Sequence, residues 1–330
     1  TMTRSLIAKL SPESSRYSAS KQGLLGIFSF LRRSSIGRKD AKLLEQFLQG
    51  YSIEVMPKTA QKVGSFREVL PEGTRVYIAH IDGTPIEDMV ATARRLADEG
   101  FDVMPHFPAR LIESKRQLAD WINRYQGEAG VKQALLLGGG LNEPIGEFAH
   151  SMELMESGLF DGFSRLHVAG HPEGNRDIDP DGSDRMVMQA LKWKRAFSER
   201  TDAKVAIATQ FCFESAPVIA WADRLASEGI DLPIHIGVAG PAKLQTLMKY
   251  ALSCGVGPSM RVLQRRAKDV TKLLLPYEPT ELLVELAAHK KKHPNFGIEQ
   301  VHFFPLGGIT ANAHWVTQNA GSAGRPARSN

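Results

Sequence analysis

The feature that most constrains this chain is an eightfold alternation between short apolar segments and longer segments with a helical pattern. From residue 51 onward, apolar runs of five to seven residues are each followed by a stretch with the 3.6-residue period of a helix. Strands are expected at 51–56, 75–80, 101–106, 132–137, 165–170, 204–210, 232–238 and 300–304. Strands that alternate with helices in this way favour a parallel sheet.

The helices that follow these strands complete the pattern. They are expected at 85–99, 114–125, 144–157, 186–200, 215–227, 241–254 and 311–318, with extra helices at 259–273 and 280–292 before the last strand. Eight units over about 270 residues match a (β/α)8 TIM barrel. An open doubly wound sheet is the alternative, although no Gly-x-Gly-x-x-Gly follows the first strand. We therefore expect an N-terminal extension (1–45), a barrel domain (46–318) and a loose C-terminal tail (319–330).

The charge of the chain is unevenly placed. The net charge is +5, yet residues 1–39 hold eight Lys or Arg against Glu13 alone, so the remainder is −2. The basic character belongs to the arm and gives no reason to expect a nucleic-acid partner. A transit-type segment, a membrane-surface helix and a packed extension all stay open for the arm.

Cysteine content and hydropathy restrict the compartment. The two cysteines, Cys212 and Cys254, give no disulfide framework and favour a reducing, cytoplasmic environment. The longest apolar run, 24–31, is too short to cross a bilayer, which takes roughly 20 residues, so no transmembrane segment is expected.

Polar residues gather at the ends of the expected strands, where a TIM barrel carries its active site. In chain order they are Glu54, His80, His106, Gly138, Gly139, Gly140, His171, Glu173, Asn175 and Gln210, with His302 in the last strand. Glu54 lies in an apolar strand that Pro57 ends. It is interpreted either as a solvent-facing glutamate or as a general acid whose pKa is raised by apolar surroundings.

The strand ends allow two further interpretations. His80, His106 and His171 could together bind a metal, but no carboxylate stands clearly beside them and no metal is expected. The triple glycine could cradle a phosphate, admit a flat ring close to the backbone, or form an ordinary flexible loop.

Taken together, the strand-end motifs resemble the methylenetetrahydrofolate reductase family, over residues 51–316. Residues 53–59, Ile-Glu-Val-Met-Pro-Lys-Thr, resemble that family's first-strand motif Phe-Glu-Phe-Phe-Pro-Pro-x-Thr. Residues 208–213, Ala-Thr-Gln-Phe-Cys-Phe, resemble its Ile-Thr-Gln-Phe-Phe-Phe and are the most specific match. Similar matches occur at 105–106, at 169–173, at 191–194 and at 302–306.

The resemblance implies a TIM-barrel oxidoreductase that interconverts 5,10-methylene- and 5-methyltetrahydrofolate with NAD(P)H. It implies that Glu54 is the catalytic acid, and that Gln210, with Phe211 and Glu173, contacts the folate. It also implies cofactor contacts, which fall on His80, His106, Gly138, Gly139, Gly140, His171, Asn175 and Lys194. The family uses FAD.

The sequence departs from the family mainly on the flavin side. The family's Arg-Gly-Asp after the fourth strand is Gly138-Gly139-Gly140 here, and a tyrosine is replaced by His171. FAD binding is therefore expected to be weak or absent. A folate-dependent one-carbon or methyl transferase and a non-reducing folate-binding partner protein are the alternative functions. The choice between NADH and NADPH, and homo-oligomerisation, stay open.

Overall fold

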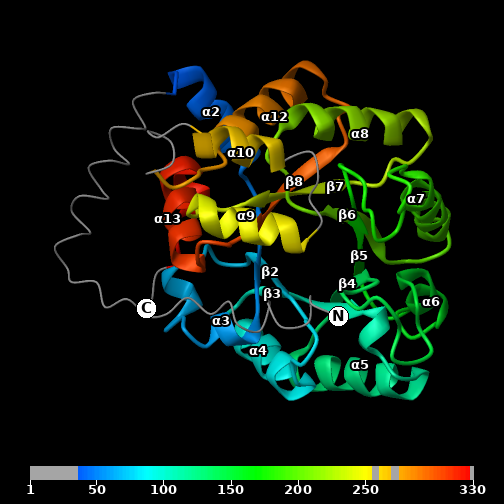
Figure 1. Cartoon of the computed structure of the whole chain (residues 1–330). Helices are drawn as coiled ribbons and strands as arrows, with labels where there is room; N and C mark the ends of the chain where they lie inside the picture. The colour runs from blue at the N-terminus through cyan, green and yellow to red at the C-terminus, as the bar shows by residue number, and fades with distance from the viewer. Residues whose placement is uncertain (1–35, 255–259, 269–274, 328–330) are drawn as a thin grey trace. The chain divides into compact units, whose positions relative to one another are not determined.

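The computed structural model describes residues 36–254, 260–268 and 275–327, and it contains the expected barrel. Eight parallel strands close in chain order, β1 pairing with β8 as well as with β2 (Figure 1). The strands are β1 (Ser52–Val55), β2 (Arg75–Ile78), β3 (Asp102–Pro108), β4 (Gln133–Leu137), β5 (Arg165–Gly170), β6 (Lys204–Thr209), β7 (Ile234–Ala239) and β8 (Ile298–Phe304). The prediction of a (β/α)8 TIM barrel is confirmed, and the open sheet is excluded.

Helices follow the strands as the periodicity predicts. The α-helices are α2 (Arg38–Phe47), α3 (Pro57–Ala60), α4 (Ile86–Asp98), α5 (Lys115–Ala129), α6 (Ser151–Glu156), α7 (Arg185–Ser198), α8 (Ser215–Ser227), α9 (Leu244–Ser253), α10 (Met260–Lys268), α12 (Thr280–Lys292) and α13 (Ile309–Asn319). Local signals set some of their ends. The Ser114 hydroxyl accepts a hydrogen bond from the Gln117 amide at the start of α5, and Gly130 ends this helix at φ +62°.

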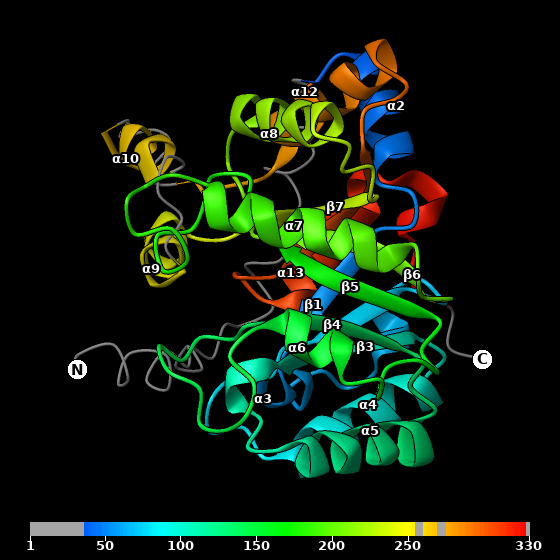
Figure 2. The same ribbon diagram turned by 90° about the vertical axis from the view of Figure 1, so that its right-hand side faces the viewer.

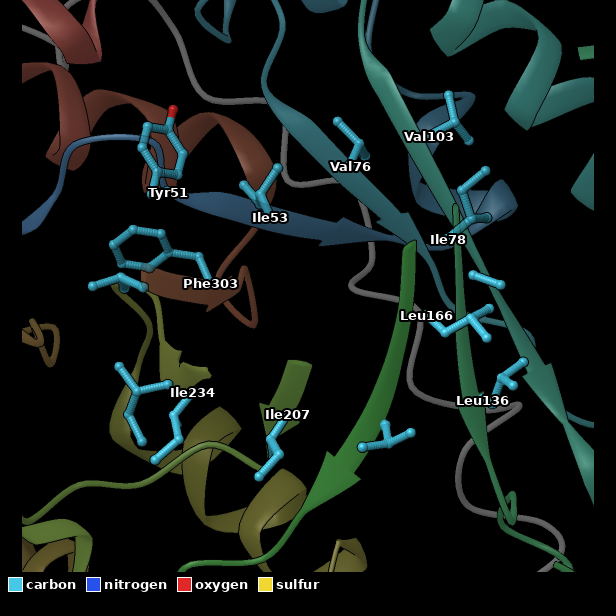
Figure 3. Close-up of a cluster of buried hydrophobic side chains, with 14 of the residues drawn as sticks. Tyr51, Ile53, Val76, Ile78, Val103, Leu136, Leu166, Ile207, Ile234 and Phe303 are labelled. Atoms are coloured by element: carbon cyan, nitrogen blue, oxygen red, sulfur yellow. The ribbon is translucent and has the colours of Figure 1, made fainter. Parts of the chain in front are cut away.

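The main apolar core lies between the strands and the helices. Alternate strand residues, among them Ile53, Val76, Leu136 and Phe303, point outward into this layer (Figure 3). The space inside the barrel is different, because its separate apolar cluster contains only Tyr77, Met104, Leu135 and Ala208, with Leu137 against it. Polar side chains occupy many of the other inward positions.

A smaller core lies beside the C-terminal ends of β6, β7 and β8. Phe211 and Phe213 pack there with Leu247 of α9, Leu263 of α10 and Tyr277. Figure 2 shows α9 and α10 on the side of the barrel where the strands end. The extra helices expected before the last strand are therefore present as α10 and α12, while part of the expected 259–273 helix lies outside the described residues.

The helix expected at 144–157 is wrong in its first half, since α6 begins only at Ser151. The preceding residues are bound to the loop after β3: the Ile145 amide donates to the Arg110 carbonyl (3.0 Å) and the Glu147 amide to the Glu113 carbonyl (3.3 Å). A Cβ on Gly146 would lie 2.1 Å from the Glu113 carbonyl oxygen, so this close approach requires glycine. Tertiary hydrogen bonds outweigh the local helical pattern here.

The expectation of a loose C-terminal tail is also wrong for residues 319–327. Gly321–Gly324 forms a 3-10 helix, in which Gly324 is buried against α13. The Ala327 amide then donates a hydrogen bond to the Leu70 carbonyl (3.0 Å). Small residues permit this packing, because a Cβ on Gly324 would lie 2.7 Å from the Val316 carbonyl oxygen.

The chain divides into two units, residues 1–41 and 42–330. The basic arm predicted at 1–45 falls largely outside the described residues, which begin at residue 36. In the described parts of the chain, no helix is both long and apolar enough to cross a membrane.

Candidate active site

The barrel brings most of the predicted site residues to the C-terminal ends of its strands. Glu54 lies in β1 and His106 in β3, one and two residues before these strands end. Gly138 follows β4, His171 follows β5 and Gln210 follows β6 directly. Because all eight strands are parallel in a closed barrel, these positions share one rim.

Glu54 is the centre of this rim. Its Oε2 lies 3.2 Å from Nε2 of His106 and 3.8 Å from Nε2 of His302. The His106 approach is close but is not aligned as a hydrogen bond. The other ring nitrogen of His302 is 2.9 Å from the Ser52 hydroxyl. The Glu54 side chain keeps 17% of its surface exposed, whereas His302 is enclosed, so Glu54 is the group that a ligand can reach.

The electrostatics of Glu54 differ from the expected raised pKa. Burial does act to raise the pKa of this carboxyl, but the two neighbouring imidazoles outweigh burial and lower it to about 2. Burial in turn lowers the pKa of His302. In the ligand-free protein Glu54 is therefore a carboxylate at neutral pH. The sequence predicts apolar surroundings for Glu54, but in the structure two histidines, His106 and His302, face its carboxylate.

Lys194 is a buried cation of α7, and its charge acts on His171, the residue after β5. Burial lowers the pKa of Lys194 to about 8. Burial, followed by the charge of Lys194, lowers the pKa of His171 to about 4. A positive charge in such surroundings is costly unless an anion neutralises it. The pair is therefore suited to a phosphate or carboxylate.

The triple glycine is fixed by contacts within the protein. The Arg110 amide donates to the Gly138 carbonyl (3.0 Å), and a Cβ on Gly138 would lie 3.3 Å from the Arg110 guanidinium. Gly139 has φ +93°, and its Cβ would lie 3.0 Å from Cβ of Pro108. Only Gly140 faces open space. These contacts favour a turn packed on the end of β3 over a flexible loop.

Three predicted contact residues have structural partners instead of facing the rim. Phe211 is 2% exposed and packs edge-on against Phe304 in the smaller core. Asn175 accepts a hydrogen bond from the Asp177 amide (2.8 Å) and shapes a turn. The ring of His80 lies against Trp121, and its Nε2 donates to the Thr84 carbonyl (3.0 Å). Each of these roles explains the residue without a ligand.

Gln210 and Glu173 stay at the rim and are partly exposed. The Gln210 side-chain oxygen accepts a hydrogen bond from the Phe211 amide (3.1 Å), which orients the side chain.

The Cys212 thiol lies next to this part of the rim. Burial, followed by the charge of Glu173, raises its pKa well above the usual value, so Cys212 is a protonated, inert thiol. Among the described residues, no group of three His, Cys, Asp or Glu has a metal-binding arrangement.

Sequence reasoning missed several interior polar residues. The strand pattern assigns His302 to the last strand without a role, and it assigns no function to Ser52, Tyr77, His167 or His235. The signal was present, since each alternates with apolar neighbours along its strand and so faces the barrel axis.

Comparisons with known proteins assign no family or function to this chain. No family model matches the chain. A psychrophilic glycoside hydrolase family 10 endo-beta-1,4-xylanase aligns over 80% of this chain and 88% of its own, at 12% identity and TM-score 0.43. The carboxyl transferase domain of Rhizobium etli pyruvate carboxylase aligns over 88% of this chain and 43% of its own, at 11% identity and TM-score 0.39. These likenesses carry no argument about activity.

Proposed function

We propose that this protein is an oxidoreductase similar to methylenetetrahydrofolate reductase, which transfers hydride from NAD(P)H to 5,10-methylenetetrahydrofolate and forms 5-methyltetrahydrofolate. The observation that carries the proposal is the partly exposed Glu54 carboxylate between His106 and His302 at the C-terminal rim. The sequence resemblance at β1 and at the β6 end supports the same activity.

The chemistry requires a proton at N10 of the folate, which opens the five-membered ring and leaves an iminium at N5 that accepts hydride. Glu54 is the donor in this proposal. A ligand that covers its exposed face removes water, and desolvation already acts to raise the pKa of this carboxyl. Substrate binding would thus favour the protonated acid that the first step needs. His106 would then hold the carboxyl in place.

The residues at the rim fit a phosphate better than they fit a flavin ring. Lys194 and His171 would neutralise a phosphate of the nicotinamide dinucleotide, which supplies the hydride when bound. Gly138 and Gly139 are used in packing against Arg110 and Pro108, and they offer an isoalloxazine ring no side-chain hydrogen bonds. We therefore propose direct reduction of the folate by NAD(P)H, without FAD.

The test uses the purified full chain. We expect NAD(P)H oxidation that depends on 5,10-methylenetetrahydrofolate, with 5-methyltetrahydrofolate identified by mass and no flavin absorbance. Glu54→Gln should lower kcat by about 10²–10⁴-fold and leave folate binding largely intact, since it removes the proton but keeps the shape. The exposed Glu68→Gln serves as the control. Methyl transfer without NAD(P)H would favour the transferase, and folate binding without turnover would favour the binding protein.

A further inference from the structure

The interior of the barrel contains a continuous line of polar side chains, here called the polar line. It begins at Glu54 and passes through His302, Ser52, Tyr77, His167 and His235 to Glu299. Glu54 lies at the C-terminal rim, whereas Glu299 is the second residue of β8 and lies at the opposite end of the barrel. The line therefore spans the barrel from one end to the other.

The links of the polar line differ in length and geometry. Nδ1 of His302 meets the Ser52 hydroxyl at 2.9 Å, and the ring centres of His302 and Tyr77 lie 4.2 Å apart. Burial raises the pKa of the Tyr77 hydroxyl, and Ser52 is near enough to act against burial and lower it. The Tyr77 hydroxyl contacts Nδ1 of His167, whose ring centre lies 4.5 Å from that of His235. Nε2 of His235 then meets Oε2 of Glu299 at 2.9 Å.

The five middle groups are enclosed, while both ends reach the surface. Ser52, Tyr77, His167 and His235 are 0% exposed, and His302 is 1% exposed. The side chain of Glu299 is 52% exposed and that of Glu54 is 17% exposed. A proton can therefore enter at one carboxylate and leave at the other, while the interior stays closed.

Counting protons shows that the line is one short. When neutral, each of the five middle groups has one exchangeable proton, and both ends are carboxylates that can only accept. Six links therefore share five protons, and one link must have none. Two places fit this vacancy: the long 3.8 Å contact of His302 with Glu54, and the His167–His235 pair. In that pair, Nε2 of His167 and Nδ1 of His235 have no hydrogen-bond partner.

We propose that the polar line carries protons from Glu299 to Glu54, so that Glu54 is reprotonated from the end of the barrel opposite its substrate. The inference rests on the proposed function in taking Glu54 as the group that gives a proton to the substrate. A bound folate and dinucleotide would cover Glu54 on the rim. An internal route supplies the acid without opening the site.

The transfer balances atom by atom. His235 first exchanges from the Nε2–H to the Nδ1–H tautomer, which moves the vacancy to its contact with Glu299. Glu299 then takes a proton from water and gives it to Nε2 of His235, and every group along the line accepts one proton and releases another. The order of the accepting atoms is Nε2 of His235, Nε2 of His167, the Tyr77 oxygen, the Ser52 oxygen, Nδ1 of His302 and a carboxylate oxygen of Glu54. Rotation of the hydroxyls and tautomer exchange restore the starting arrangement.

The charges around the line favour neutral relay groups. Arg75 of β2 and Arg165 of β5 lie near the line, and burial followed by neighbouring cations and imidazoles lowers the pKa of His167 well below its usual value. Burial also lowers the pKa of His235, against the opposing effect of Glu299. Since an added positive charge is disfavoured here, both imidazoles are neutral at rest, and the relay uses their neutral forms.

The first experiment measures the protonation of the histidines in the polar line, without any substrate. The ten histidines are labelled with 15N in the full chain, and their tautomers are measured by long-range proton–nitrogen NMR. Glu299→Gln replaces an acceptor with an amide that can donate to Nε2 of His235. We expect His235 to change to the Nδ1–H tautomer and the His302 signals to shift as well. Asp231→Asn, which removes an exposed carboxylate bound to Arg195, should change neither.

The second experiment interrupts the polar line by removing the Tyr77 hydroxyl. Tyr77→Phe should abolish the response of His302 to Glu299→Gln. Tyr125→Phe, which removes a buried hydroxyl that has no hydrogen-bond partner, should preserve it. Ser52→Ala cuts the same line if Tyr77→Phe does not fold. A His302 signal that ignores Glu299→Gln, or that responds equally after the cut, would overturn the proposal.

Kinetics separate this proposal from the proposed function. Tyr77→Phe should slow proton-limited turnover by about 10²-fold at unchanged KM, and Tyr125→Phe should not. If the wild-type protein is inactive but the His302 signals still respond to Glu299→Gln, the reductase proposal is wrong and the coupling along the polar line stands. If the protein is an active reductase but the response is absent, only the proposal of the polar line is wrong.

Discussion

At the scale of single residues, the buried charge of Lys194 lowers the stability of the folded protein. Burial lowers its pKa from 10.5 to about 8, so at neutral pH it is still mostly charged within α7. The folded protein therefore carries the cost of a buried cation below about pH 8. A bound anion, such as the phosphate of the proposed dinucleotide, would offset the free-energy cost of burying this charge.

Lys194→Met should stabilise the protein and weaken NAD(P)H binding. Removing the buried charge is expected to add about 1–3 kcal/mol to the free energy of unfolding at pH 7. Because the folded protein holds the neutral amine more readily than the unfolded chain does, this gain should shrink as the pH rises from 8 to 10.5. Thermal unfolding at several pH values measures it. Lys192→Met on the exposed side of α7 is the control, and equal effects of the two changes would contradict the interpretation.

At the scale of elements, sequence reasoning succeeded where the signal is local. The ranges of β5, α8 and α12 match their predicted ranges, because apolar periodicity and flanking polar residues are contained in the segment itself. It failed at residues 144–150, where Gly146 packs against the loop after β3. It placed Glu54 and His106 on the rim, but it did not predict the polar line, since that line depends on the barrel register that pairs Ser52 with His302.

The loop after β4 offers a matched pair of substitutions. Gly139 has φ +93° and contacts Pro108, whereas Gly140 has open space at its Cβ position. Gly139→Ala should therefore cost about 1–3 kcal/mol of stability, while Gly140→Ala should be neutral or stabilise by up to about 1 kcal/mol. Urea unfolding compares the two. A Gly139→Ala protein as stable as the wild type would show that the loop is not held as described.

At the scale of the whole molecule, the buried histidines make the fold sensitive to acid. Burial lowers the pKa of His167, His235 and His302, and with the charge of Lys194 it lowers that of His171 to about 4. The unfolded chain binds protons at these groups near pH 6.5, before the folded protein does. The folded state therefore has its full stability with respect to these groups above about pH 6.5, and it loses free energy of unfolding as the pH falls below that value.

We therefore expect the Tm to fall between about pH 6.5 and pH 4, above the range in which Glu54 contributes. The low pKa of Glu54 favours the folded state above about pH 4.5, and this contribution is lost only as the pH falls toward 2. Calorimetric scans across this range give the slope. His171→Gln should flatten it, and the exposed His314→Gln should leave it unchanged. A slope that His171→Gln does not alter would contradict this assignment.

The smaller core under α9 and α10 has a consequence for motion. Its residues pack with one another and form a cluster apart from the main layer. We therefore expect this part of the chain to open as a cooperative unit at a free energy below that of global unfolding. Phe211, which directly follows Gln210, belongs to this unit together with Phe213. Hydrogen exchange in α9 and α10 and the order of Gln210 are then linked, and a ligand that holds Gln210 slows the exchange of helices it does not touch.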